Sequence, residues 1–256
     1  MLIRLLLGLG IGTILVLFVL KKHLLTLSGA LLALALLLDI LLLGGYAPAV
    51  YIITVFLLSG LVGKLAKPKK EEKNHRPRDL WQVGANGAGA GLAILLYGIA
   101  QTPIFLIAYY AAVAEFFTDT LASDIGVHAK GAPLDLARMK RTERGRSGGV
   151  SLLGTAASAL GALLCFLLAL GAGLPAPAAA IAATTAFFGM LIDSILGSLC
   201  QAKYTCRACS AYTEKPLHCN APAEKTGGFS WITNSTVNLL SNLLTAILAA
   251  LLALAL

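Results

Sequence analysis

Hydrophobic residues form long runs along the chain, separated by short polar segments. A membrane-spanning helix needs about 17–25 predominantly apolar residues. Runs of this length cover residues 1–20, 24–43, 46–63, 80–99, 103–122, 148–171, 176–199 and 231–256. The first run has no small-x-small cleavage site before Lys21 and Lys22, so we expect a retained span and not a signal peptide. The pattern predicts an all-α, polytopic integral membrane bundle of about eight transmembrane helices.

The composition supports a membrane protein. The 256 residues are 58% hydrophobic and 12% charged, whereas soluble domains carry about 25% charged residues. We therefore exclude soluble, disordered and disulfide-scaffold classes and expect the lipid bilayer, and no nucleic acid, as a partner. We expect one transmembrane domain over 1–256. Its parts are a three-span segment at 1–63, a basic linker at 64–79 and a five-span core at 80–256 that includes a Cys- and His-containing loop at 200–230.

The basic residues predict the orientation in the membrane. Of the 20 Lys and Arg residues, all except Arg4 fall between spans one and two or in 64–79, 127–147 and 200–230. The connections at 44–45, 100–102 and 172–175 contain none. Positively charged loops face the cytoplasm. We therefore expect a multi-pass protein of the cell (inner) membrane, with both termini outside and the basic loops in the cytoplasm.

Polar residues within the spans lie at one level. With a helical rise of about 1.5 Å per residue, Asn86, Asp119, Asp193 and Asn238 all fall within roughly 10 Å of the cytoplasmic face. Hydrogen bonding between helices explains a single such residue, but it does not require one shared depth. The pattern favours a site that faces the cytoplasm. Its further candidate residues are Arg78, Gln82, Thr120, Ser123, Asp124, Ser151, Ser194 and Asn234.

Asp119 and Asp193 are candidate metal ligands. Mg²⁺ binds one or two protein carboxylates together with phosphate oxygens and water. The alternative is that each carboxylate pairs with Arg78 or with a lysine. The residue types leave both interpretations open.

A basic, glycine-containing segment precedes the sixth span. Arg144 and Arg146 are followed by Ser147, Gly148 and Gly149, which we expect to open a helix. Backbone N–H groups at a helix N-terminus bind phosphate, and Arg pairs with phosphate bidentately. The alternative is a flexible connection with Ser147 as the helix cap. The spacing of a Walker A loop is absent.

The loop at 200–230 holds a cluster of possible zinc ligands. These are Cys200, Cys206, Cys209, His218 and Cys219. A Cys-x2-Cys pair with a further Cys or His can hold Zn²⁺ tetrahedrally. Free thiols and a catalytic thiol are the alternatives, and a cytoplasmic position disfavours disulfides.

Several motifs together resemble one membrane family, the domain of unknown function 92. It includes proteins similar to transmembrane protein 19 and the phytyl-phosphate kinases of plants and cyanobacteria. The matching motifs are Arg78-x3-Gln82-Val-x2-Asn86, Asp119-Thr-Leu-Ala-Ser123-Asp-Ile-Gly126, Ser147-Gly-Gly-Val-Ser-x2-Gly154-Thr155, Asp193-Ser-x2-Gly197 and Asn234-x3-Asn238. The resemblance runs from about Gly29 to the C-terminus.

This resemblance implies a kinase that transfers a phosphoryl group from a nucleoside triphosphate, expected to be CTP, to an isoprenyl monophosphate such as phytyl phosphate. Mg²⁺ on Asp119 and Asp193 would bridge the phosphates. Arg144, Arg146 and the 147–149 amides would bind the donor. The acceptor phosphate would be oriented by Arg78, Gln82, Asn86 and Asn238.

A transporter or flippase of a phosphorylated lipid is the main alternative function. Transporters bind substrate near the membrane midplane, commonly between internal repeats. The chain shows no repeat between its halves, and its polar level lies on one side of the membrane.

Overall fold

The structure is a computed structural model, and it describes residues 2–66 and 77–256. Within these residues, eight helical segments are long and apolar enough to cross a membrane, as predicted. They are α1 (Leu2–Lys21), α2 (Leu27–Asp39) with its π-helical continuation η1 (Ile40–Gly44), α3 (Tyr46–Ala66), α4 (Leu80–Ala100), α5 (Pro103–Gly126), α6 (Leu152–Gly171), α7 (Ala176–Leu199) and α8 (Asn234–Ala253). Most of the basic linker predicted at 64–79 falls on 67–76, outside the described residues.

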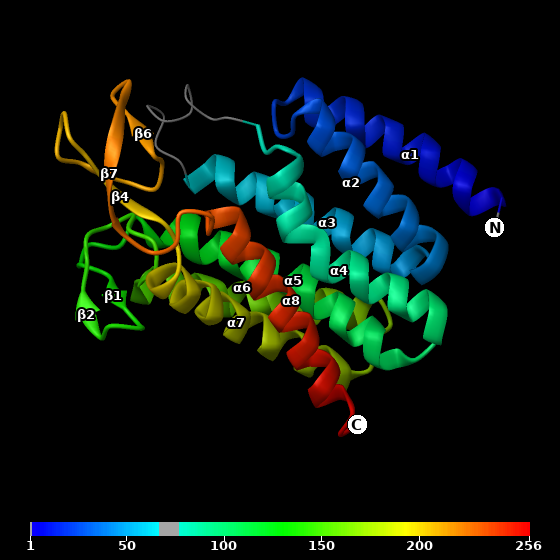
Figure 1. The fold of residues 1–256 in the computed structure, drawn as a ribbon. Coiled ribbons are helices and arrows are strands. Elements are labelled where there is room, and N and C mark those ends of the chain that lie inside the picture. Colours follow the sequence, from blue (N-terminus) through cyan, green and yellow to red (C-terminus); the bar gives the residue numbers. More distant parts are fainter. Residues whose placement is uncertain (1, 67–76) are drawn as a thin grey trace.

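The helices run roughly along one common direction, and two small sheets lie at one end of the bundle (Figure 1). We call this end the sheet end. The α1–α2, α5–α6 and α7–α8 connections lie there, while α8 ends at the opposite side. The basic connections that the structure describes in full are therefore grouped at one end.

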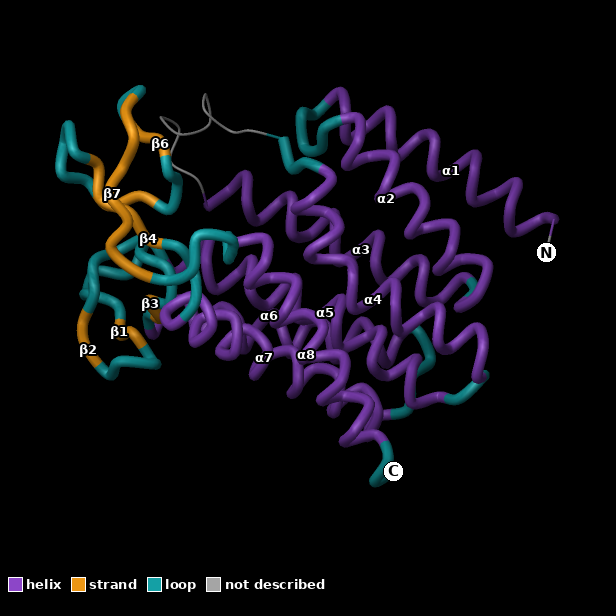
Figure 2. The backbone as a smooth tube through the Cα atoms, in the orientation of Figure 1, coloured by secondary structure: helices purple, strands orange, loops and turns teal. Residues whose placement is uncertain are grey.

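The sheets are a feature that the hydrophobic pattern did not predict. Strands β1 (Leu134–Asp135), β2 (Lys140–Arg141) and β3 (Gly149–Val150) pair in the order β2-β1-β3. Strands β4 (Lys203–Cys206), β5 (Tyr212–Thr213), β6 (Leu217–His218) and β7 (Ala221–Gly227) pair in the order β5-β4-β7-β6 (Figure 2). All the pairs are antiparallel. Strands this short show almost no alternation of apolar and polar residues.

Side-chain caps fix the starts of α6 and α4, of which α6 starts later than the predicted 148 and α4 starts at the predicted residue 80. The Ser151 side chain accepts a hydrogen bond from Gly154 N, so α6 begins at Leu152 and not at 148. Asp79 caps α4 through a reciprocal capping box with Gln82. Arg78 therefore precedes the helix and does not continue the helical face that carries Gln82 and Asn86.

Helix α5 is the centre of the bundle and packs against α3, α4, α6, α7 and α8. Its Tyr109 hydroxyl donates a hydrogen bond to Pro48 O at 2.7 Å, and Thr118 donates to Ala186 O at 3.0 Å. Small residues allow the closest approach, because a Cβ atom added at Gly154 would lie 2.6 Å from Ala122 O. The residues of α5 that face the site are therefore held from several sides.

Replacing Gly154 with alanine should destabilise the bundle, because the added methyl meets a backbone carbonyl that has no room to move. Overpacking of this kind costs about 1–3 kcal/mol, so the thermal midpoint in detergent should fall. Gly171→Ala on the same helix meets nothing within 4 Å and is the matched control. Equal midpoints for the two variants would contradict the close packing of α5 and α6.

Candidate functional site

The site is built around a buried carboxylate in α5. Glu115 accepts hydrogen bonds from Ser241 at 2.9 Å and from Asn242 Nδ2 at 2.7 Å, both on α8. Asn242 also donates to Ala112 O and accepts from Gly89 N, which joins α4 to the same group. Glu115 is only 3% exposed. A carboxylate at this depth is costly unless hydrogen bonds satisfy it, and these contacts satisfy both of its oxygens.

Two glycines make the network possible. A Cβ atom at Gly89 would lie 2.6 Å from Asn242 Oδ1, and one at Gly189 would lie 2.1 Å from Thr245 Oγ1 and 2.6 Å from Glu115 Cγ. Any side chain at these two positions would separate α8 from α4 and α7. The helices therefore approach one another most closely where their polar groups meet.

A second carboxylate, Asp193 of α7, is joined to the first through α8. Ser241 Oγ lies 3.1 Å from Asp193 Oδ2. With its amide nitrogen turned toward Asp193, Asn238 donates to the same oxygen at 3.2 Å. The amide groups of Asn238 and Asn86 lie 3.0 Å apart. The structure thus brings Asn86, Asp193 and Asn238 together from three helices.

Asp119 lies one helical turn from Glu115, toward the sheet end, and its charge interacts with those of Glu115, Asp193 and Asp124. No hydrogen bond from residues 2–66 or 77–256 reaches its carboxylate. Neither Asp119 nor Asp193 forms an ion pair with a described Lys or Arg. The ion pairs among the described residues are Arg138–Asp135 and Arg207–Glu224. Direct pairing with Arg78, the alternative to a metal, is therefore absent from the described structure.

Arg78 faces this acidic group from the segment before α4. Its backbone is fixed by hydrogen bonds from Arg78 N to Leu24 O and from Thr26 N to Arg78 O. Its guanidinium lies 5.4 Å from the centre of the Phe116 ring. Burial lowers the pKa of Arg78, and the charges of Asp124 and Asp119 act in the opposite direction. An arginine remains charged under such conditions, so it supplies one positive charge beside several carboxylates.

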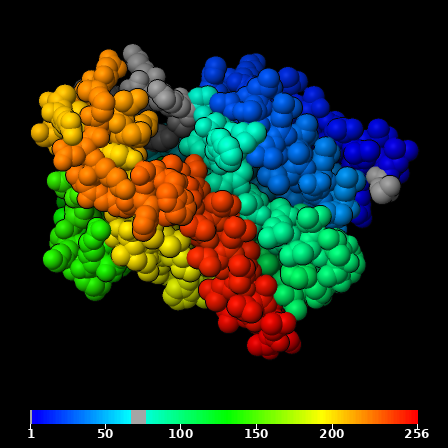
Figure 3. All heavy atoms as spheres, viewed as in Figure 1, coloured from blue at the N-terminus to red at the C-terminus, as the bar shows by residue number. Residues whose placement is uncertain are grey.

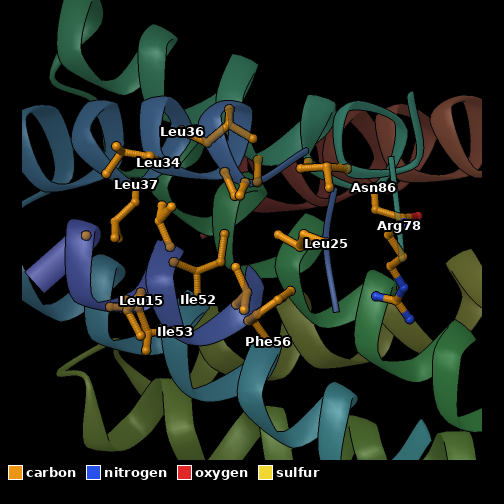
Figure 4. Close-up of a pocket in the computed structure, with 18 of the residues that line it drawn as sticks. Leu15, Leu25, Leu34, Leu36, Leu37, Ile52, Ile53, Phe56, Arg78 and Asn86 are labelled. Carbon is orange, nitrogen blue, oxygen red and sulfur yellow. The ribbon is translucent and has the colours of Figure 1, made fainter. Parts of the chain in front are cut away.

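An apolar cavity of about 140 Å³ adjoins Arg78. Helices α1, α2 and α3 supply apolar lining, and Gln82 and Asn86 lie with Arg78 at its polar end. Figure 4 shows Leu15, Leu34, Leu37 and Ile52 on one side of the cavity and Arg78 with Asn86 on the other. The cavity therefore has an apolar body and a cationic end.

The segment expected to open a helix at Ser147–Gly149 does not do so. Gly149 belongs to β3, which pairs with β1, and its N–H donates to Arg146 O. Gly145 and Gly148 have positive φ angles of 75° and 87°, as their residue type allows. A Cβ atom at Gly148 would lie 2.5 Å from Ser198 Cβ. The prediction of a helix N-terminus at 147–149 is wrong, and so is its alternative, a cap at Ser147. Contact with α7 explains Gly148, and the cap is Ser151.

The two arginines of this loop both line an open concavity, but only Arg146 also contacts the four-stranded sheet. The Arg146 guanidinium lies 4.9 Å from the centre of the Tyr212 ring, next to β5. Arg144 is exposed, donates to Lys130 O and lines an open concavity with Arg141, Thr142 and Glu143. Ser147 donates to Gln201 Oε1 at 2.8 Å. The structure therefore brings Arg146 and Ser147, but not Arg144, to the four-stranded sheet.

The 200–230 loop adds two charged residues, Lys203 and Glu214, that were not among the predicted site residues. Burial raises the pKa of Glu214. Hydrogen bonds with Tyr212 and Gln201 and the positive charge of Lys203 lower it by less. Glu214 also acts electrostatically on Asp193. Burial lowers the pKa of Lys203, and nearby Arg138 and Arg146 lower it further. In the space-filling view the 200–230 segment lies directly against the start of α8 (Figure 3). No local pattern in the sequence marked Glu214 or Lys203.

Asp135 anchors the smaller sheet to α7. It accepts a hydrogen bond from Ser198 at 2.6 Å and forms an ion pair with Arg138. Burial would raise the pKa of Asp135, but the hydrogen bonds from Ser198, Arg138 and Ala137 outweigh burial and lower it. Lys203 in turn donates to Ser198 O. Both sheets are thus attached to the last turn of α7, beyond Asp193.

The remaining predicted residues are less closely joined to the carboxylates. Thr120 donates to Phe116 O within its own helix, and Ser123 is exposed. Asn234 is exposed at the start of α8, next to Asn238. Asp124 lies near Arg78 and near Gly63 of α3. Ser194 has no hydrogen bond to another described side chain.

Four of the five possible zinc ligands meet. The side-chain ligand atoms of Cys206, Cys209, His218 and Cys219 all lie within 4.8 Å of one another. Cys200 is the C-cap of α7 and lies outside this group. Its backbone forms hydrogen bonds with Leu196 and Phe229.

The comparisons with known proteins agree with the membrane architecture. The family model described as integral membrane protein DUF92 matches residues 10–246. An uncharacterized membrane protein of Methanocaldococcus jannaschii is 30% identical over 166 residues, which cover 62% of this chain and 67% of the relative. No solved structure matches the chain. Since the family model covers nearly all of the helical bundle, the chain belongs to the DUF92 family of integral membrane proteins.

Proposed function

We propose that this protein is a membrane-embedded kinase of isoprenyl monophosphates that uses a nucleoside triphosphate, expected to be CTP, to make the diphosphate. One observation carries the proposal. Asp119 and Asp193 form no ion pair with a described Lys or Arg, yet they lie near Arg78, which stands at the polar end of an apolar cavity. A lipid phosphate has this combination of an apolar tail and an anionic head.

The cavity suits the part of the acceptor next to its phosphate. A volume of about 140 Å³ is close to that of an engineered cavity that binds benzene. It therefore accommodates about one isoprene unit, and the rest of the chain would lie in the bilayer. Arg78 would bind the phosphate, with Asn86 and Asn238 as hydrogen-bond donors.

The carboxylates fit a divalent cation. Asp119 accepts no hydrogen bond from the described residues, and in Asp193 only Oδ2 accepts hydrogen bonds, which leaves Oδ1 open. Both are therefore able to bind Mg²⁺, which keeps several waters and phosphate oxygens as ligands. When bound, Mg²⁺ would neutralise phosphate charge. Glu115 is already saturated by Ser241 and Asn242 and serves to position α8.

The donor would bind on the sheet side of the carboxylates. Arg146 and Lys203 place positive charge there, from both connecting loops. Arg144 would take part only through the open concavity that it lines. Residues 147–149 form no helix N-terminus, so the proposed donor site does not include one. The basic connections at this end support a cytoplasmic site, where nucleoside triphosphates are found.

The transfer itself requires positioning more than covalent catalysis. An oxygen of the acceptor phosphate attacks the γ-phosphorus, the bond from that phosphorus to the bridging oxygen breaks, and the nucleoside diphosphate leaves. The acceptor is already an anion, so no strong base is needed. Arg78 and Arg146 would hold the two phosphates against their mutual repulsion.

The direct test is phosphoryl transfer by the purified protein in detergent with Mg²⁺, labelled CTP or ATP, and phytyl or geranylgeranyl monophosphate. The wild type should form the diphosphate, and Asp119→Asn should lower kcat by roughly 100-fold or more. Asp39→Asn is the matched control, since Asp39 is an exposed carboxylate of α2 outside the site. If no pair of donor and acceptor gives product while the protein binds isoprenyl phosphate, the kinase proposal is wrong, and lipid flipping in liposomes should be measured.

Filling the cavity should weaken acceptor binding. Ala33 lines the cavity, so Ala33→Phe should raise the KM for isoprenyl phosphate about tenfold, equivalent to about 1.4 kcal/mol, and leave the KM for the nucleotide unchanged. Ala35→Phe, on the exposed side of the same helix, is the control. An unchanged acceptor KM in Ala33→Phe would place the lipid elsewhere.

A further inference from the structure

We propose that Cys206, Cys209, His218 and Cys219 bind one structural Zn²⁺ ion that holds the four-stranded sheet together. The site would lie in the 200–230 loop, outside the membrane-spanning helices. It is independent of the proposed kinase activity, and its presence can be measured without any substrate.

The distances among three of the ligand atoms match tetrahedral zinc, and the fourth, Cys206 Sγ, lies within 4.8 Å of each of them. With Zn–S near 2.3 Å and Zn–N near 2.0–2.1 Å, a tetrahedron requires S···S distances of about 3.8 Å and S···N distances of about 3.6 Å. The Cys209 and Cys219 sulfurs lie 3.7 Å apart. His218 Nδ1 lies 3.5 Å from Cys209 Sγ and 3.3 Å from Cys219 Sγ. The cysteines are free, and an S–S bond would require about 2.05 Å.

The four ligands come from two hairpin turns. Cys206 ends β4, and Cys209 lies in the turn to β5. His218 ends β6, and Cys219 begins the turn to β7. The fold thus brings two Cys- and His-containing turns together, and one ion would cross-link them. Three thiolates and one imidazole fill a tetrahedron, so no position remains for water or substrate, as in structural zinc sites.

The small core of the sheet favours such a cross-link, and the geometry of one turn presents a ligand to it. Its apolar core is small: Ala202, Tyr204 and Cys206 are buried, but most of β7 and both turns are exposed. In addition, Cys219 has a φ of 52°, a left-handed conformation that non-glycine residues seldom adopt. Asn220 has a φ of 55°, so the two residues form a tight left-handed turn that presents Cys219 beside His218. Small domains with little core are commonly stabilised by a metal.

The cross-link would also determine where Glu214 and Tyr212 lie. Both belong to the stretch between the two turns, and Tyr212 donates to Glu214 at 3.4 Å. Tyr212 contacts Arg146, and Glu214 acts on Asp193. Zinc would therefore fix these side chains above the carboxylate group without contacting any substrate.

The test is the metal content of the full-length protein, purified in detergent with a phosphine reductant and without chelators. We expect about one Zn²⁺ per chain. Replacement by Co²⁺ should give the intense visible bands of tetrahedral cobalt and sulfur-to-cobalt charge transfer in the near ultraviolet. Cys209→Ser and Cys219→Ser should each lower the affinity for zinc by at least tenfold in competition with a chromophoric chelator.

Cys200→Ser is the matched control, because Cys200 belongs to the same connection but lies outside the cluster. It should keep the full zinc content. His218→Cys should also keep one metal ion and should shift the cobalt bands toward those of four thiolates, which separates loss of a ligand from misfolding. Wild-type protein that binds neither zinc nor cobalt, a Cys209–Cys219 disulfide found by mass spectrometry, or loss of zinc in Cys200→Ser would overturn the proposal.

Discussion

The burial of Glu115 in an apolar bundle is the constraint on which the site depends. A carboxylate far from water must be satisfied by hydrogen bonds, and here Ser241 and Asn242 of α8 supply them. This requires α8 to approach α4 and α7 so closely that only glycine fits at positions 89 and 189. The same Ser241 also contacts Asp193. Satisfying one buried carboxylate therefore fixes the position of another that remains open to ligands.

The helices could be predicted from the sequence because a membrane helix satisfies its own backbone hydrogen bonds, so its extent depends mainly on local hydrophobicity. The sequence places Asn86, Asp193 and Asn238 at one depth, and in the structure their side chains meet. Glu115 lies one helical turn before Asp119 but was not among the predicted site residues, because its role depends on which helix lies opposite it. The four-residue spacing of Asn234, Asn238 and Asn242 on α8 is the signal that could have indicated its partner.

The connections could not be predicted in the same way, since their structure depends on pairing between distant residues. Gly148 and Gly149 have the composition of a phosphate-binding turn, yet Gly149 pairs with β1 and Gly148 packs against Ser198. Lys203 and Glu214 lie near each other only because β4 pairs with β5 and β7. A sequence pattern shows where a glycine or a charged residue occurs. It does not show which distant part of the chain that residue contacts.

The three N-terminal helices and the five-span core have different relations to the proposed chemistry. The first three supply apolar lining to the cavity, whereas its polar lining and the carboxylates come from residue 78 onward. The two parts are joined at Arg78, whose backbone is hydrogen-bonded to Leu24 and Thr26 between α1 and α2. The cation proposed to bind the acceptor phosphate is thus positioned by the segment that bounds the lipid cavity. A lipid phosphate at the polar end of the cavity would therefore meet Arg78 beside the carboxylates.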